Sequence, residues 1–145
     1  MLPSYFKGFG VDANVTVVDS RIEEYDAATS STGQAEFGLL PGTAKTTANA
    51  ALFYEAHGAD LRLSAQYVGR QLFTLGGSKA NDTIEDERTT LDFASAYHVN
   101  RTWTVYFNAK NLTNAPLRFF VGNPSFPIQR EFYEVTYEAG VKAHF

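Results

Sequence analysis

The sequence predicts an all-β protein, an antiparallel up-and-down meander of about six long strands arranged as three hairpins. Three observations predict this fold. Apolar and polar residues alternate with a period of two in six segments, as they do in strands with one apolar face. The connections between these segments are long and short in turn. The 8 Tyr and 12 Phe make the chain rich in aromatic residues, which favour strands.

The composition excludes several other classes of protein. The 145 residues contain no cysteine, which excludes a disulfide framework and a thiolate metal site. A net charge of −4 argues against a nucleic-acid-binding protein, which would carry a basic surface. No apolar run approaches the ~18 residues of a membrane-spanning helix. A mean hydropathy of −0.23 still allows strands that cross a membrane, because such strands alternate apolar and polar residues.

The first two strands are predicted at residues 7–20 and 45–55. In the first, the odd positions from Phe9 to Val17 are apolar, and the even positions between them are small or polar. Residues 21–43 are rich in Glu, Asp, Ser, Thr and Gly, and they end near a Pro-Gly turn signal. We therefore expect a long loop between the two strands.

The third and fourth strands are predicted at residues 60–73 and 88–99. A very short connection, His-Gly-Ala at residues 57–59, precedes the third strand, and Gly58 gives it the conformational freedom of a tight hairpin turn. Residues 74–87 contain a Gly-Gly pair and several acidic residues, so they are expected to form the second long loop.

The last two strands are predicted at residues 102–110 and 130–145. A short turn around residues 100–101 precedes the fifth strand, and residues 111–129, with three prolines, are expected to form the third long loop. The final segment reads as one strand, with apolar odd positions and polar or small even positions. Phe132 is the single exception to this alternation.

Alternation alone leaves open whether the apolar face meets a protein core or lipid. Three features favour a membrane barrel. The strands, at about 9–16 residues, are longer than the usual strands of soluble sheets. Long loops and short turns alternate, as they do in outer-membrane barrels. Aromatic residues collect near the short turns, as in a membrane-interface girdle, and these are Tyr54, Tyr97, Trp103 and Phe145. The alternative is a soluble β-sandwich or a lipocalin-like binding protein.

Six stretches of the chain, in their order and spacing, carry a family resemblance. They are F-K-G-F-G-V-D-A-N-V-T at 6–16, L-P-G-T-A-K-T-T-A-N at 40–49, L-F-Y-E-A-H-G-A-D-L-R-L-S-A-Q-Y at 52–67, R-T-T-L-D-F-A-S-A-Y at 88–97, A-K-N-L-T-N at 109–114 and Y-E-A-G-V-K-A-H-F at 137–145. With them the chain resembles the C-terminal part of a TonB-dependent receptor, a family of ligand-gated transporters of the Gram-negative outer membrane.

The resemblance implies a transmembrane β-barrel of about 22 strands with an N-terminal plug domain in its lumen. Residues 1–145 would be a single segment, the last part of that barrel, without the plug, and we expect the chain to be a fragment. The implied function is import of a siderophore, vitamin or carbohydrate with energy supplied through TonB. The implied location is the cell outer membrane. The implied partners are outer-membrane lipid, the barrel-assembly machinery and, in a full-length parent, the remaining barrel, the plug and TonB, but no nucleic acid.

Few residues stand out as a binding site. Arg70, Lys110 and Glu134 are the lumen-facing charges nearest the long loops, so they are weak candidates for contact with a substrate. The simpler interpretation is that they solvate the lumen and pair across strands. The acidic run at residues 85–87, with Asp82, is expected to be a solvated loop rather than a site for a metal chelate.

No enzymatic or metal chemistry is predicted. The three histidines at positions 57, 98 and 144 share no ligand spacing, so no metal site and no cofactor are expected. Ser, His and Asp residues occur outside any catalytic motif, so we expect no catalytic residues and no enzyme.

The end of the chain resembles the C-terminal signal that the barrel-assembly machinery reads in outer-membrane proteins. The residues that carry this likeness are Tyr137, Ala139, Val141 and Phe145. In this interpretation the last strand closes the barrel and Phe145 lies at the periplasmic interface.

Overall fold

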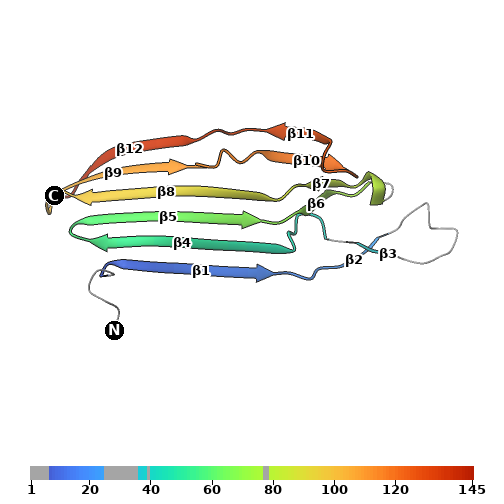
Figure 1. The fold of residues 1–145 in the computed structure, drawn as a ribbon, viewed down its shortest axis with the longest axis horizontal. Helices are drawn as coiled ribbons and strands as arrows, with labels where there is room; N and C mark the ends of the chain where they lie inside the picture. Colours follow the sequence, from blue (N-terminus) through green and yellow to red (C-terminus); the bar gives the residue numbers. More distant parts are fainter. Residues whose placement is uncertain (1–6, 25–35, 39, 77–78) are drawn as a thin grey trace.

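A computed structural model describes residues 7–24, 36–38, 40–76 and 79–145, and the described chain forms three antiparallel sheets (Figure 1). Its elements are β1 (Phe9–Val17), β2 (Ile22–Glu24), β3 (Glu36–Gly38), β4 (Thr46–Ala56), β5 (Ala59–Val68), β6 (Gln71–Thr74), the 3-10 helix η3 (Lys79–Asn81), β7 (Thr83–Glu85), β8 (Arg88–His98), β9 (Trp103–Lys110), β10 (Leu117–Val121), β11 (Pro127–Glu131) and β12 (Thr136–Ala143). The predicted all-β, antiparallel fold is confirmed.

Six strands form one sheet, in the order β1-β4-β5-β8-β9-β12, which we call the long sheet. Each strand pairs with the next member of this order without a shift in register. Neighbouring strands of the meander are therefore neighbours in space, as the alternating segments predict. β1 and β12 are the two edges of this sheet (Figure 1).

The two short connections have recognisable turn chemistry. His57 and Gly58 join β4 to β5, and both have positive φ, 54° and 76°, as a type I′ hairpin turn requires. The β8–β9 connection is held by Asn100, whose Oδ1 accepts hydrogen bonds from the backbone N–H groups of Thr102 and Trp103 at 2.8 and 2.9 Å. We call this end of the long sheet the turn end, and the other end the loop end.

The segments predicted as long loops contain β2, β3, β7, β10 and the start of β11, which corrects the sequence-based prediction, whereas β6 lies mainly at the end of the predicted strand 60–73. β6, β7, β10 and β11 form a second sheet beyond the loop end, in the order β11-β10-β7-β6, which we call the short sheet (Figure 1). β2 and β3 pair with each other inside the first predicted loop, of which residues 25–35 and 39 lie outside the described chain. The sequence did not reveal the short sheet because its strands have only 3–5 residues, too few for alternation to show.

Two predicted strands are each divided in two. The predicted strand 60–73 breaks at residues 69–70, between β5 and β6. The predicted strand 130–145 is wrong as one element, because β11 ends at Glu131 and β12 begins at Thr136. The physical reason is Glu134, whose φ of 57° lies in the left-handed region and cannot continue a strand. This break also explains why Phe132 departs from the alternation.

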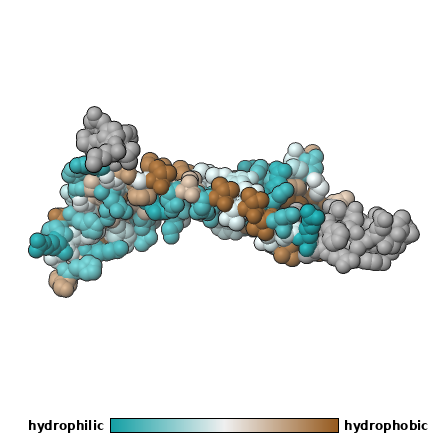
Figure 2. Space-filling view, turned by 90° about the horizontal axis from the view of Figure 1, so that it is seen from below, coloured by the Kyte–Doolittle hydropathy of each residue, from teal (hydrophilic) through white to brown (hydrophobic). Residues whose placement is uncertain are grey.

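The long sheet is a single layer, whereas the buried apolar side chains cluster in the short sheet. Leu72 and Phe120 are only 2% and 5% exposed, and Phe119 packs on Phe73 with ring centroids 4.8 Å apart. In contrast, Val11 and Val141 on the two edge strands of the long sheet are 74% and 60% exposed. In Figure 2 the middle of the molecule is thin, and apolar patches follow one another along it between polar ones.

Candidate functional site

The register of the long sheet divides its side chains into two chemically different faces. Cross-strand partners share a face, and successive residues alternate between faces. The face that we call apolar comprises Phe9, Val11, Ala13, Val15, Val17, Thr46, Ala48, Ala50, Leu52, Tyr54, Ala56, Ala59, Leu61, Leu63, Ala65, Tyr67, Thr89, Leu91, Phe93, Ser95, Tyr97, Trp103, Val105, Phe107, Ala109, Tyr137, Ala139, Val141 and Ala143. None of these paired residues is charged, and every charged residue of the six strands lies on the opposite, polar face.

Three of the four aromatic residues predicted at a membrane interface, Tyr54, Tyr97 and Trp103, lie together at the turn end of the apolar face. Tyr54 lies two residues before the end of β4, Tyr97 lies one residue before the end of β8, and Trp103 begins β9. The Tyr54 ring packs on Phe9 at 4.7 Å, and its hydroxyl lies 3.1 Å from Nδ1 of His57. Tyr97 and Trp103 are about half exposed. The two rings thus lie at the rim of an apolar surface, a position that aromatic residues favour at interfaces.

The residues predicted as an assembly signal lie at one edge of the same face. Tyr137, Ala139 and Val141 are successive apolar-face residues of β12, and Tyr137 stacks on Phe107 of β9 at 6.1 Å. Phe145 follows the end of β12 and is fully exposed. β12 pairs with β9 on one side only, so its other side presents free backbone hydrogen-bonding groups in the described part of the chain.

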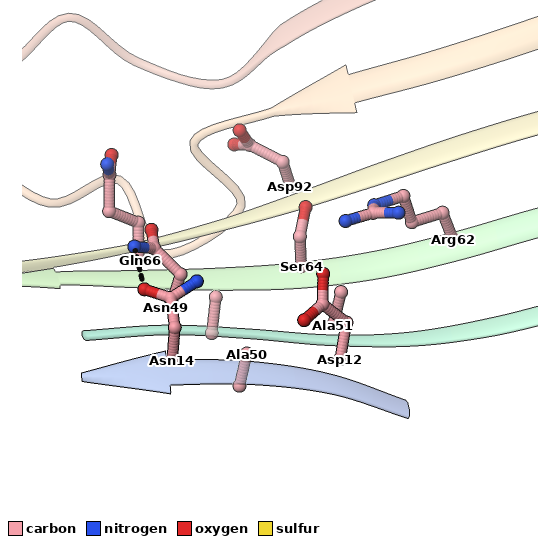
Figure 3. A pocket seen from close by; sticks show the side chains of 10 residues that line it. Asp12, Asn14, Asn49, Ala50, Ala51, Arg62, Ser64, Gln66 and Asp92 are labelled. Atoms are coloured by element: carbon pink, nitrogen blue, oxygen red, sulfur yellow. Dashed lines mark hydrogen bonds between the residues drawn. The ribbon is translucent and has the colours of Figure 1, made fainter. Parts of the chain in front are cut away.

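The polar face is hollowed at its centre, where small residues separate charged ones. Asp12, Ala51, Ser64 and Asp92 stand in one row across β1, β4, β5 and β8. Because alanine and serine are small, the row leaves a hollow of about 330 Å³ between the two carboxylates (Figure 3). Arg62 extends into its rim from the neighbouring row.

A row of amides borders this hollow toward the loop end. Asn14, Asn49 and Gln66 are cross-strand neighbours, and Nδ2 of Asn49 donates a hydrogen bond of 3.1 Å to Oδ1 of Asn14 (Figure 3). Amides both donate and accept hydrogen bonds. Together with two carboxylates and one guanidinium, they make a surface that can bind polar groups of either kind, or water.

A second hollow, of about 390 Å³, lies on the same face toward the turn end. Its floor is made by Ala94 and Ala96 of β8. The aromatic rings beside it lean over glycines of the edge strands: a Cβ on Gly10 would lie 2.2 Å from the Phe53 ring, and one on Gly140 would lie 2.5 Å from the Tyr106 hydroxyl. These glycines make room for the rings and leave the alanine floor open.

The three weak substrate candidates are not brought into one site. Arg70 lies in the break between β5 and β6, where its Nε donates a 2.8 Å hydrogen bond to Asp86. Lys110 ends β9 opposite Thr136. Glu134 lies in the break before β12, and its carbonyl accepts a 3.0 Å hydrogen bond from the Asn111 amide. The ion pairs of the described residues include Arg70 but neither Lys110 nor Glu134.

The acidic run is only partly solvated, which corrects the sequence-based expectation: Glu85 ends β7, whereas Glu87 is exposed. Asp82 and Asp86 are both buried. Asp82 accepts a 2.8 Å hydrogen bond from the backbone N–H of Gly76, and Asp86 forms ion pairs with Arg70 and Arg118 at 2.8 and 3.0 Å. Hydrogen bonding to Asp86 raises the pKa of the Arg70 guanidinium.

One chain of polar groups on the polar face has the order of a hydrolytic triad. Nδ1 of His98 lies 2.9 Å from the Thr104 hydroxyl, and its Nε2 lies 2.9 Å from a carboxylate oxygen of Asp60. Thr104, however, pairs with strands on both sides, so the ladder occupies the backbone donors that would bind an oxyanion. These three polar side chains therefore suit a hydrogen-bonded link between strands better than nucleophilic catalysis.

The residues of the two hollows escaped sequence reasoning, which recognised the ionisable face but not its rows. Which charge stands beside which small residue depends on the register, and alternation within a strand carries no such information.

In the described part of the chain no group of three or more His, Asp or Glu residues is placed to hold a metal ion. No helix there is long and apolar enough to cross a membrane. No family model, curated protein or solved structure matches the chain.

Proposed function

We propose that the chain is a wall segment of an outer-membrane β-barrel whose apolar face meets lipid. A single observation carries the proposal: all paired charges of the long sheet lie on one face, while the other face is apolar, uncharged and uncovered. Uncovered apolar surfaces of this extent are rare on soluble proteins. A bilayer removes such a surface from water, at about 25 cal/mol per Å² of apolar area.

The dimensions of the long sheet support this proposal. Its strands have 8–11 residues, close to the ~9–11 residues of a tilted strand that crosses the hydrocarbon core. The interface aromatics lie at the turn end, and the short sheet, with its buried ion pairs, lies beyond the loop end. We place the turn end at the periplasm and the short sheet outside the cell, because outer-membrane barrels have short periplasmic turns.

The function that we propose is transport, because of the resemblance to TonB-dependent receptors. The polar face would line the lumen of a barrel of about 22 strands with a plug, and import a siderophore, vitamin or carbohydrate with energy supplied through TonB. Six strands are too few to close a barrel, since single-chain barrels begin at about eight. Both edges of the long sheet would then pair with further strands. A soluble β-sandwich would need a second layer on the apolar face, and the described residues place none there.

The lipid contact can be tested with tryptophan fluorescence in vesicles that contain brominated lipids, which quench tryptophan on contact. Trp103 is the only tryptophan, so Trp103→Phe gives a silent background. In this background Phe107→Trp places the probe on the apolar face, and Asn108→Trp places it one residue along on the polar face. We expect strong quenching of the probe at 107 and weak quenching of the probe at 108.

Equal quenching at both positions would contradict the proposal. So would a chain that folds cooperatively as a monomer in buffer without detergent, because a folded soluble monomer must bury its apolar face elsewhere. Trp103 itself serves as a depth marker: bromines near the headgroups should quench it more than bromines near the bilayer centre.

A further inference from the structure

The two sheets meet along one line of strand breaks. Four segments cross from the long sheet to the short sheet, at residues 69–70, 86–87, 111–116 and 132–135. Neighbouring crossings lie side by side, and together they run obliquely across the molecule (Figure 1). The strand ladders of both sheets stop at this line, and the ladder of the short sheet has register shifts at Phe119–Phe120 and Leu72–Thr74. The short sheet is therefore one hydrogen-bonded body attached to the long sheet by four short segments and by backbone hydrogen bonds that include the 2.8 Å bond from the Gly42 N–H to the Leu72 carbonyl.

A buried carboxylate spans this line. Asp86 lies two residues before β8, and one of its oxygens accepts a 2.8 Å hydrogen bond from Arg70, which lies two residues after β5. Its other oxygen pairs at 3.0 Å with Arg118 of β10, and the backbone N–H of Asp86 donates to the Arg118 carbonyl at 2.9 Å. The Asp86 side chain is 7% exposed. Asp86 thus joins the ends of two strands of the long sheet to the middle of the short sheet.

The contacts around Asp86 are strong but not complete. Arg118 is also held by the Pro124 carbonyl at 3.0 Å, and the Arg70 guanidinium lies 5.8 Å from the centre of the Phe120 ring. Nε of Arg118, however, is buried and has no hydrogen-bond acceptor among the described residues. A buried donor without a partner destabilises the arrangement that buries it. Opening the line would expose this donor to water.

We propose that Asp86 clamps the short sheet at its angle to the long sheet, and that the short sheet tilts as one body when the clamp is released. Removing one partner of a buried ion pair leaves an uncompensated charge, which the structure relieves by opening. The line of breaks offers the place to open, because no ladder has to be broken there. The proposal concerns only the two sheets and does not rest on the assignment to a membrane.

The tilt can be measured as a distance between two spin labels in the full chain, kept in detergent micelles. The protein has no cysteine, so Arg101→Cys in the β8–β9 turn and Ser125→Cys in the β10–β11 turn give one defined pair of labels. Asp86→Asn removes the charge and keeps the size. We expect it to shorten and broaden the end-to-end distance distribution, while amide exchange within β6, β7 and β10 stays slow because their ladder is intact.

A matched control is Glu87→Gln, since Glu87 is half exposed and its pair with Arg70 is longer, at 3.7 Å. It should leave the distance distribution unchanged. Arg118→Lys keeps the charge and loses the planar fork, so it should give a smaller shift than Asp86→Asn, and it tests the clamp if Asp86→Asn does not fold. An unchanged distance in both Asp86→Asn and Arg118→Lys would overturn the proposal. Fast amide exchange throughout the short sheet would also overturn it, because the sheet would then be unfolding rather than tilting.

Discussion

The long sheet and the short sheet have the same backbone hydrogen bonding but opposite means of stabilisation. The short sheet buries Leu72, Phe119 and Phe120, and at its border the buried Asp86 pairs with two arginines, of which Arg118 belongs to this sheet. The long sheet has six strands, and its large apolar side chains remain substantially exposed. A small domain usually places its apolar residues in the largest sheet's core. Here the largest sheet lacks a core.

This difference identifies what each sheet needs from its surroundings. The short sheet buries Leu72, Phe119 and Phe120 with its own side chains, although Phe73 and Ile128 remain more than half exposed, so part of its stability does not depend on an apolar environment. The long sheet pairs its backbone groups internally except along the edges β1 and β12, but its apolar face gains stability only when something apolar covers it. The two sheets therefore differ in the medium that each one contacts. Mutations can test this difference in each sheet separately.

The largest effect is expected in the short sheet. Phe120→Ala should reduce the free energy that protects the short sheet from opening by about 3–5 kcal/mol, because a buried phenylalanine is removed and a cavity remains. The matched change in the long sheet is Phe107→Ala, whose side chain is 40% exposed. In detergent it should have less than half of that effect. Amide exchange, read separately for β10 and β9, measures both.

Equal losses of opening free energy in Phe107→Ala and Phe120→Ala would contradict this contrast between the sheets, because they would mean that Phe107 is as well buried as Phe120. A loss of protection that spreads from β10 through the whole long sheet would also contradict it. The two sheets would then be a single cooperative unit.

The next largest effect is expected from a charge on the apolar face. Leu63→Arg, at the middle of β5, should destabilise the folded chain in bilayers by about 2–4 kcal/mol, the range for a cation at the bilayer midplane. Ser64→Arg is the control, because the adjacent position faces the polar hollow between Asp12 and Asp92. It should change stability by no more than about 0.5 kcal/mol. Denaturant titration of vesicle-bound protein measures both, and equal effects would contradict the assignment of the faces.

The sequence predicted the long sheet well because each of its strands is long enough for the alternation to be seen. The sequence pattern locates all six strands and both short turns. It missed the short sheet for two reasons: strands such as β7 have only three residues, and their burial comes from contacts between segments far apart in the chain. The sequence pattern also predicted one continuous strand across Glu134, because a glutamate gives no sign of its left-handed φ of 57°.

The same limit applies to the candidate site. That one face is ionisable can be read from alternation, but the row that joins Asp12 to Asp92 follows from four strands in register. The buried state of Asp86 was likewise hidden, because its partners Arg70 and Arg118 are 16 and 32 positions away. Local sequence cannot show that an acidic run is neutralised by residues at such separations.

A smaller effect is expected at the turn end of the long sheet. Gly58 has a φ of 76°, so Gly58→Ala should cost about 1–2 kcal/mol, the usual penalty for a left-handed residue with a Cβ. His57→Asn in the same turn is the control, because asparagine tolerates the left-handed region and Asn-Gly favours a type I′ turn. It should be neutral or slightly stabilising. Amide exchange at the paired ends of β4 and β5 measures both, and a loss confined to the short sheet would contradict the prediction.

The smallest effect is expected from pH, which should change a contact at the border of the short sheet and leave the long sheet unchanged. Hydrogen bonds from Tyr133 and Gln129 lower the pKa of Glu131, and the bond to Glu131 raises the pKa of Tyr133. A lowered carboxyl pKa stabilises the fold above the ordinary value and loses this contribution as pH falls through the lowered one. The raised tyrosine pKa contributes below the ordinary value and is lost as pH rises through the raised one. The hydrogen bond between Tyr133 and Glu131 therefore contributes fully to stability between the ordinary carboxyl pKa and the ordinary tyrosine pKa. Its contribution falls at lower and at higher pH.

Tyr133→Phe should return the pKa of Glu131 toward its ordinary value, which carboxyl carbon chemical shifts can follow through an NMR titration. The variant should leave the amide signals of the long sheet unmoved, because Glu131 and Tyr133 lie at and beyond the end of β11, next to the break before β12. Identical Glu131 titrations in the two proteins would show that the hydrogen bond is absent in solution. Shifts that spread along β12 would show instead that the break transmits the change, and that the two sheets are less independent than their contrasting stabilisation implies.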